Sequence, residues 1–148
     1  MDPFLCLTGA YEFRNLVSIE LQNFKSFLGQ HLVGPFSSLT SIVGPNGGGK
    51  SNLVDAVAFA LLLPLAQGKH AHVRDLVYRP QPGAAKQPDA APDGVTMFVQ
   101  LNFADQVSFR RSFVGATNAS EFQVEKHGGV VSPLIQAEYR QQLAARGL

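Results

Sequence analysis

The chain has 148 residues, a formal net charge of +1 at pH 7, 45% hydrophobic residues and 16% charged residues. This length corresponds to about one domain, which can bury roughly 70% of the surface that its unfolded chain exposes. The near-neutral charge argues against a protein that binds nucleic acid or membrane mainly through electrostatics. The single Cys6 excludes an internal disulfide framework, and no apolar run approaches the roughly 20 residues that span a bilayer.

The N-terminal part predicts an extension followed by two strands. Residues 1–15 show no clear period, and Asp2 and Pro3 stand where a secretory signal would have basic residues. Residues 17–22 alternate between apolar and polar side chains, which is typical of a half-buried strand. A turn at 23–27 then leads into a returning strand at 30–33, which Gly34-Pro35 ends.

The next stretch predicts a strand, a glycine loop and a helix. Residues 39–43 are short, apolar and partly β-branched, as in a buried central strand. Behind the loop, apolar residues recur at helical spacing until Pro64. They are Leu53, Val54, Val57, Ala60 and Leu61. Because only Ser51, Asn52 and Asp55 are polar, most of the helix circumference is expected to be buried.

The loop itself satisfies the phosphate-loop pattern G-x-x-x-x-G-K-[ST] from Gly44 to Ser51. Its glycines allow positive φ and leave backbone N–H groups free to surround phosphates, next to the positive end of the helix. Lys50 would add a charge to the β- and γ-phosphates, and the Ser51 hydroxyl would bind Mg²⁺. The predicted nucleotide-binding residues of this loop are Gly44, Pro45, Asn46, Gly47, Gly48, Gly49, Lys50, Ser51 and Asn52.

The second half predicts an antiparallel β-meander. Residues 67–79 read as a loop with a short helical turn at 73–76, and residues 81–94 as a flexible loop inside the domain, with three prolines. Strict alternation over 95–103 predicts a strand. Further strands follow at 107–113, 122–124 and 130–131, joined by short turns.

The chain ends in a predicted helix. Ser132 is the expected N-cap and Pro133 the expected first helical residue. Ile135, Tyr139 and Leu143 form one apolar stripe, and Gly147 is expected at the C′ position.

Several side chains admit two interpretations. Lys25 is either a solvated turn lysine or a phosphate contact. Five basic residues are better read as exposed solubilising charges than as a DNA-facing surface. They are Lys69, Arg74, Arg79, Arg110 and Arg111. Phe98 and Phe109 are expected in the core rather than on a base-stacking platform.

Residues around the loop resemble the N-terminal ATPase head of structural maintenance of chromosomes (SMC) proteins. The similar stretches are 23–27, 34–36, 42–56, 74–78, 109–115, 121–124 and 139–148. They cover nearly everything after residue 15. Among SMC types, the Gly-Pro-Phe turn and the ending at 138–148 look most like the first cohesin SMC subunit.

The resemblance implies a fold and a ligand. The fold is the α/β N-terminal lobe of a P-loop NTPase head of ABC type, over residues 16–148, with an antiparallel meander and a C-terminal helix. The ligands are ATP and Mg²⁺, with Lys25 and Ser26 beside the phosphates at the end of the first strand. The family usually has Ser where Gly48 stands, which keeps the backbone donor and loosens the loop.

The resemblance also implies partners. Family heads combine both ends of a long chain, and the signature motif and Walker B strand are not found in these 148 residues. We therefore expect ATP hydrolysis only in a composite head completed by a C-terminal half. Further partners implied are a second SMC subunit, a kleisin and, as an option, DNA, with no membrane. The setting implied is the nucleus and chromosome, in sister-chromatid cohesion and DNA repair during the cell cycle.

Three alternatives stay open. The chain could be a complete, non-hydrolysing nucleotide-binding or interaction module. It could belong to another SMC type, as in condensin or DNA repair. A small kinase or GTPase is disfavoured, because no D-x-x-G or N-K-x-D signal occurs and the region behind the loop is a meander.

Overall fold

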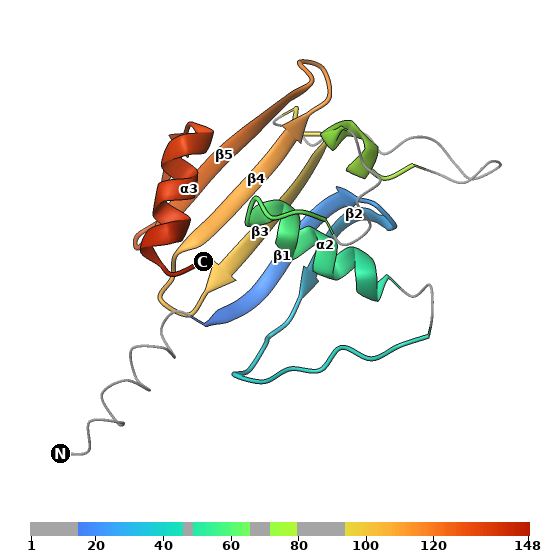
Figure 1. Ribbon diagram of the computed structural model, residues 1–148, viewed down its shortest axis with the longest axis horizontal. Helices are drawn as coiled ribbons and strands as arrows, with labels where there is room; N and C mark the ends of the chain where they lie inside the picture. The colour runs from blue at the N-terminus through green and yellow to red at the C-terminus, as the bar shows by residue number, and fades with distance from the viewer. Residues whose placement is uncertain (1–14, 46–48, 66–71, 80–93) are drawn as a thin grey trace.

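The computed structural model describes residues 15–45, 49–65, 72–79 and 94–148, and its centre is one antiparallel sheet (Figure 1). The sheet has six strands in the order β2-β1-β3-β4-β5-β6. The strands are β1 (Leu16–Phe24), β2 (Phe27–Val33), β3 (Met97–Phe103), β4 (Ser108–Val114), β5 (Ala119–Lys126) and β6 (Val130–Leu134). The other elements are helix α2 (Lys50–Ala60), the 3₁₀ turn η1 (Val73–Leu76) and helix α3 (Gln136–Ala145).

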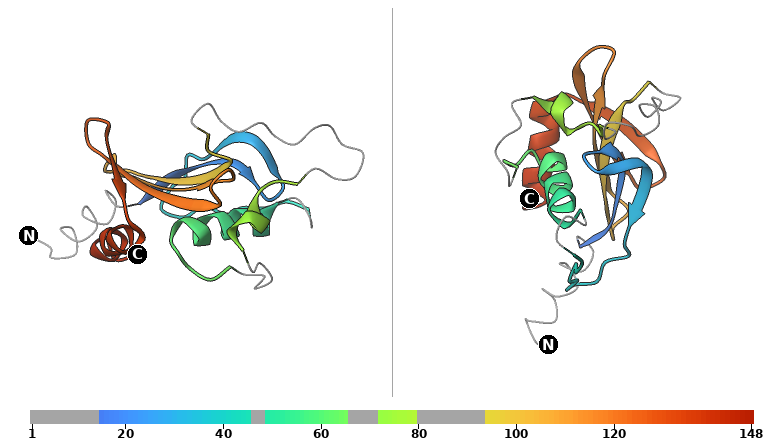
Figure 2. Two further views of the ribbon diagram at one scale, coloured as in Figure 1. Left: turned by 90° about the horizontal axis from the view of Figure 1, so that it is seen from above. Right: turned by 90° about the vertical axis from the view of Figure 1, so that its right-hand side faces the viewer.

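Both helices lie on the same face of the sheet (Figure 2). The alternation of β3 explains how: Met97, Val99 and Leu101 point into one core cluster with the buried residues of α2 and α3. The α2 residues of that cluster are Leu53, Ala56, Phe59 and Ala60, and those of α3 are Tyr139 and Leu143. The core is therefore a two-layer sandwich of helices on a sheet.

Most of the predicted elements are confirmed. The strands at 17–22, 95–103 and 107–113 correspond to β1, β3 and β4, and the helical turn at 73–76 is η1. Strand β5 is longer than the predicted 122–124, because its ladder with β4 runs from Ala119 to Glu125. The predicted N-terminal extension lies outside the described residues except for Asn15, and the loop at 81–94 except for Gly94.

The predicted strand at 39–43 is wrong. Residues 38–45 form no strand, and the exposed fractions of Leu39 and Val43 are 86% and 88%. A strand needs a neighbour to pair its N–H and C=O groups, and none of the six described strands pairs with this segment. The apolar pattern therefore did not decide the backbone conformation, because no described strand pairs with the segment.

The predicted start of the last helix is also wrong. Ser132 and Pro133 belong to β6, where Pro133 lies opposite Gln123. Proline is tolerated there because β6 is an edge strand, so that one side needs no donor. Helix α3 begins at Gln136, and the Glu138 carboxylate accepts a hydrogen bond from the Ile135 N–H at 3.2 Å. Ile135, expected in the apolar stripe, is 66% exposed.

The predicted helix end is confirmed. Gly147 has φ +80, its N–H donates to the Ala144 carbonyl at 3.0 Å, and the Leu148 N–H donates to the Leu143 carbonyl at 3.1 Å. These two bonds are the Schellman pattern that a C′ glycine permits. Across the described residues, no helix is long and apolar enough to cross a membrane.

Candidate nucleotide-binding site

Helix α2 begins immediately behind the glycine loop. Its N-cap is Gly49, which has φ 91, and its first residue is Lys50. This left-handed conformation favours glycine and turns the chain sharply from the loop into the helix. The first intrahelical bond runs from the Leu53 N–H to the Gly49 carbonyl at 3.0 Å. The N–H groups of the first turn have no partner within the helix and form an anion-binding end.

Two charged or polar side chains of this turn are placed for a phosphate. Lys50 bends back over the loop, and its ammonium donates to the Gly44 carbonyl. Ser51 is exposed at the helix start. A lysine at the start of the helix and an exposed hydroxyl next to it are groups that could contact a magnesium–triphosphate tail. Residues 46–48 of the predicted site lie outside the described residues.

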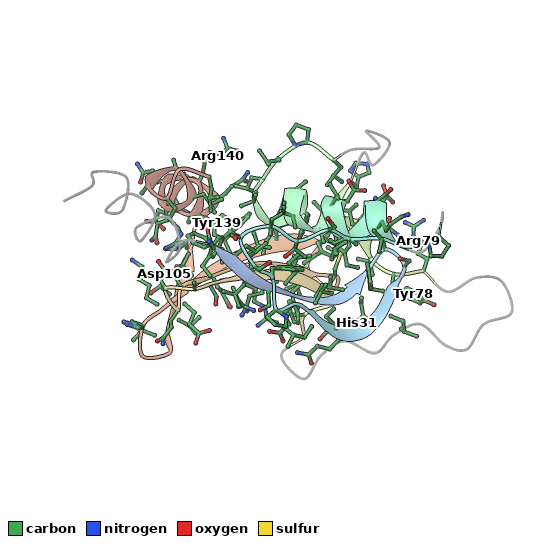
Figure 3. All side chains as sticks on the ribbon, turned by 90° about the horizontal axis from the view of Figure 1, so that it is seen from below. His31, Tyr78, Arg79, Asp105, Tyr139 and Arg140 are labelled. Carbon is green, nitrogen blue, oxygen red and sulfur yellow. The ribbon has the colours of Figure 1, made fainter. Side chains whose placement is uncertain are left out.

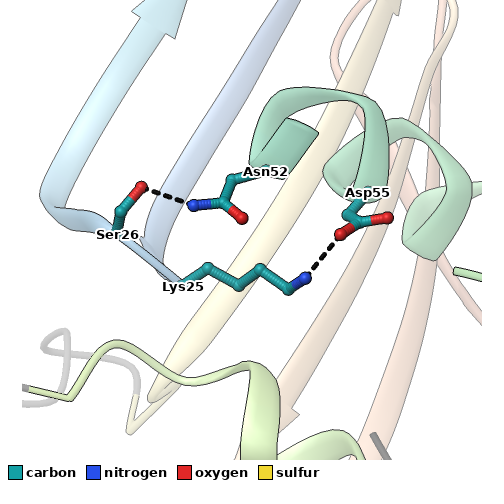
Figure 4. Close-up of polar contacts among 4 residues, drawn as sticks. All are labelled: Lys25, Ser26, Asn52 and Asp55. Carbon is teal, nitrogen blue, oxygen red and sulfur yellow. Dashed lines mark hydrogen bonds and ion pairs between the residues drawn. The ribbon is translucent and has the colours of Figure 1, made fainter. Parts of the chain in front are cut away.

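The turn between β1 and β2 is joined to α2 by two side-chain contacts (Figure 4). The Lys25 ammonium lies 2.5 Å from the Asp55 carboxylate, and the Asn52 amide donates to the Ser26 hydroxyl at 2.8 Å. The Lys25 side chain is 9% exposed and the Asp55 side chain is fully buried. The alternative of a solvated turn lysine is therefore wrong. The expected burial of most of α2 is confirmed, because only Ser51 and Val54 of the helix are exposed. The polar Asp55 nevertheless points inward, while the apolar Val54 is 58% exposed.

The same turn is tied to the segment behind η1 through the backbone. The Lys25 N–H donates to the Leu76 carbonyl at 2.7 Å, and the Tyr78 N–H donates to the Asn23 carbonyl at 2.7 Å. These bonds place Tyr78 and Arg79 near the start of α2, at the opposite end of the molecule from Tyr139 and Asp105 (Figure 3). An open pocket of about 590 Å³ lies between the turn, α2 and this segment. Its lining residues are Lys25, Ser26, Asn52, Asp75, Val77, Tyr78 and Arg79.

Three residues of this region were missed by the sequence analysis. The sequence contained a signal for Asp55, because it is the one acidic residue in an apolar helix and Lys25 lies in the turn at 23–27. Tyr78 lay in a stretch that resembles the family and Arg79 was named only as an exposed charge, but the loop before them has no period that would set its direction. Their position depends on backbone bonds to Asn23 and Lys25 across the chain.

An apolar groove of about 310 Å³ lies on the other side of α2, under the segment that precedes the loop. Its lining includes Phe36, Ile42, Leu53, Val54 and Val57. The exposed Leu39 and Val43 belong to the same segment. The segment before the phosphate loop therefore turns Ile42 toward this groove and leaves Leu39 and Val43 exposed.

Comparisons with known proteins agree with this geometry. The model of the RecF/RecN/SMC N-terminal domain matches residues 15–137. The chain belongs to this family. It is 37% identical over 114 residues to structural maintenance of chromosomes protein 1 of Arabidopsis thaliana, which covers 74% of this chain and 9% of that protein. The chain thus spans about a tenth of the length of that curated relative.

Solved structures show the same fold. One, from work titled "Structural biochemistry of ATP-driven dimerization and DNA stimulated activation of SMC ATPases", superimposes with a TM-score of 0.69 at 25% identity. It covers 90% of this chain and 80% of that chain. The SMC head domain from Thermotoga maritima has a TM-score of 0.59 at 26% identity, over 86% of this chain and 41% of that chain. The expected fold, an N-terminal segment of an SMC head that resembles SMC1, is confirmed.

Proposed function

We propose that this chain is the ATP-binding half of a cohesin-type SMC ATPase head. The observation that carries the proposal is the start of α2, where Gly49 in left-handed conformation, Lys50 over the loop and exposed Ser51 meet at one helix end. The similarity to an SMC1 protein supports the cohesin type.

The residues of the site divide the task. The first-turn amides of α2 and Lys50 would hold the β- and γ-phosphates, and Ser51 would bind Mg²⁺, which would neutralise phosphate charge when present. The pocket beside Ser26, Asn52 and Tyr78 is open to the same helix end and would receive the nucleoside. Lys25 is paired with Asp55, so its contribution to phosphate binding is indirect: it fixes the turn that carries Ser26.

The exposed segment before the loop supports a composite head. Leu39 and Val43 are apolar, β-like and uncovered within the described residues. Strands supplied by the C-terminal half of the same head would pair with this segment and cover the groove beside it. From the family resemblance we expect the second magnesium ligand and the water-positioning carboxylate in that half, so hydrolysis would follow its addition.

The direct test is titration of the 148-residue chain with a fluorescent ATP analogue in the presence and absence of Mg²⁺. Saturable binding is expected, and Lys50→Ala should weaken it at least about tenfold because a charge-assisted contact to phosphate is lost. Ser51→Ala should remove most of the Mg²⁺ dependence. Lys126→Ala, an exposed lysine at the far end of β5, is the matched control and should bind like wild type.

The composite nature is tested by co-expression with the C-terminal half. Steady-state ATPase activity should appear only in the combined head and should vanish with Lys50→Ala. A combined head with no rate above background would contradict hydrolysis and leave a nucleotide-binding module. Binding that is unaffected by Lys50→Ala would contradict the site itself.

The wider role follows from the family. We propose that the completed head pairs with a second SMC subunit and a kleisin on nuclear chromosomes, in sister-chromatid cohesion. Contact with DNA would then be made by the assembled heads.

A further inference from the structure

The C-terminal end of α2 is held by two side chains from distant parts of the chain. The last carbonyls of an α-helix lack partners within the helix. Here the Ala60 carbonyl accepts a hydrogen bond from the Tyr139 hydroxyl at 2.8 Å, and the Phe59 carbonyl accepts one from Arg111 Nη1 at 3.0 Å. Tyr139 comes from α3 and Arg111 from β4. We call these two residues the helix clamp.

Tyr139 is fixed on every side. It is fully buried, and its ring lies 5.1 Å from that of Phe122 and 5.6 Å from that of Phe109. Figure 3 shows Tyr139 between α3 and the sheet, whereas the next residue, Arg140, points away from the body of the protein. Burial raises the pKa of the Tyr139 phenol, although the charge of Arg111 partly opposes this, so the hydroxyl remains a donor at neutral pH.

Arg111 was expected to be an exposed charge, and that expectation is wrong. Its guanidinium lies 4.1 Å from the centre of the Phe59 ring and 5.6 Å from that of Phe122. Burial lowers the pKa of Arg111 from its ordinary value, but guanidinium remains charged at neutral pH. A cation at this position also faces the negative end of the α2 dipole. Arg111 therefore binds the helix end through a hydrogen bond, ring stacking and charge.

We propose that the helix clamp positions the first turn of α2, so that a displacement of α3 that moves Tyr139 changes phosphate binding at that end of α2. The inference rests on the proposed function. Helix α2 has 11 residues and is therefore a rod of about 16 Å, with the loop at one end and the clamp at the other. A rigid rod transmits a shift or rotation of one end to the other.

The route from α3 to the loop is short. Tyr139 and Leu143 are the buried residues of α3, and the rest of the helix is largely exposed. The hydrogen bond from Tyr139 to Ala60 is thus a polar link between this lightly anchored helix and α2. At the middle of α2, the ion pair between Lys25 and Asp55 opposes free movement of the rod, so the clamp and that pair together set the direction of the first-turn amides.

The test uses Tyr139→Phe, which keeps the ring and removes the hydroxyl. Affinity for the fluorescent Mg-ATP analogue should fall about five- to tenfold, the effect of one lost hydrogen bond. Hydrogen exchange at the amides of residues 50–53 should accelerate relative to exchange in β3 and β4. Arg111→Lys, which keeps the charge but loses the planar stacking group, should give a smaller change in the same direction.

Leu143→Val is the matched control, because it removes a buried methylene group from α3 and leaves the hydrogen bond from Tyr139 to Ala60 in place. It should lower the melting temperature and leave the nucleotide affinity within twofold of wild type. Equal affinity in Tyr139→Phe and wild type would overturn the proposal, and so would an equal loss in Leu143→Val. If wild type does not bind the analogue, the proposed function fails, and hydrogen exchange decides the inference alone: unchanged exchange at residues 50–53 in Tyr139→Phe would overturn it.

Discussion

Strand β3 and the segment before the phosphate loop, residues 39–43, both carry apolar side chains, but they lie in opposite environments. In β3, Met97 and Val99 are fully buried, because β1 and β4 pair with the strand and α2 covers it. In the segment, Leu39 and Val43 are equally apolar and are almost fully exposed. Apolar character predicts that a stretch is suited to a strand, but pairing decides whether one forms.

The difference also separates the residues that stabilise the fold from the residues that remain exposed on its surface. The strands of the meander pair with one another, because each strand from β3 to β6 lies beside the next one in the chain. No described strand pairs with the segment, and water can satisfy its exposed backbone groups. Folding of the chain should therefore depend on the sheet and hardly on the segment.

The largest expected effect contrasts these two regions directly. Phe109 is 1% exposed and contacts both Phe103 and Tyr139, so Phe109→Ala should lower the free energy of unfolding by about 3–5 kcal/mol. Leu39→Ala should change it by less than about 0.5 kcal/mol, because the side chain is already in water. Urea denaturation followed by circular dichroism measures both.

Phe109→Leu keeps the contrast measurable if the alanine variant does not fold. It should be destabilised clearly, but less than Phe109→Ala. A loss in Leu39→Ala similar to that in Phe109→Leu would show that the segment is packed in solution, and the comparison between the two regions would fail.

The second prediction tests whether helix α2 contributes to the stability of the fold as the sheet does. Asp55→Ala would leave the largely buried Lys25 ammonium without this carboxylate and should cost about 3 kcal/mol. Such a loss would show that α2 stabilises the fold together with the sheet, although the helix follows the exposed segment in the chain. Thermal and urea unfolding of the purified variant give the value.

The double variant Lys25→Met/Asp55→Leu is the control for this pair. It removes both charges, so it should recover much of the stability lost in Asp55→Ala. If the double variant is as unstable as the single one, the ion pair is not the cause of the loss.

Much of this comparison could be predicted from the sequence. Strict alternation located β1, β3 and β4, because period-2 patterns survive wherever one face of a sheet is covered. The Gly147 helix end was also predictable, because a C′ glycine depends on local backbone geometry. The start of the last helix was predicted wrongly at Ser132 and Pro133, because serine and proline are as compatible with an edge strand as with a helix start.

The site was predictable only where it is local. The loop and the start of α2 follow from one contiguous motif, and the resemblance added Lys25 and Ser26. The pairing of Lys25 with Asp55 and the burial of Arg111 depend on which strand and which helix face meet in three dimensions. Hydrophobicity scales rank a charged side chain as exposed, so the sequence favoured the wrong environment for Arg111 and left that of Lys25 open.

The third prediction concerns the stability contribution of Gly34, which follows β2 and precedes the exposed segment. Gly34 has φ +143, and a Cβ there would lie 2.8 Å from the Val17 carbonyl oxygen, a backbone atom that cannot turn aside. Gly34→Ala should therefore cost about 2 kcal/mol. Gly44→Ala is the control, because an added Cβ there meets the flexible Lys50 side chain at 3.8 Å. Differential scanning fluorimetry should show a clear drop for the first and little change for the second. Equal drops would mean that the segment at Gly44 is as tightly held as the end of β2.

The smallest effect is at the far end of the covered face, where Arg146 pairs with Asp105 through two contacts of 2.8 and 2.9 Å. Burial alone would raise the pKa of Asp105, but the hydrogen bond and charge of Arg146 outweigh it and leave the pKa below its ordinary value of 3.8. A carboxyl with a lowered folded pKa adds stability above its unfolded pKa and loses it as the pH falls through the folded value. Asp105→Asn should therefore cost up to about 1 kcal/mol at pH 7 and nothing once the pH is well below 3.8. The exposed pair Asp75 and Arg79 is the control, and Asp75→Asn should change the melting temperature little at either pH. A difference between Asp105→Asn and wild type that persists in strong acid would show that the asparagine disturbs packing, and would remove the ion pair from the forces that hold α3 on the sheet.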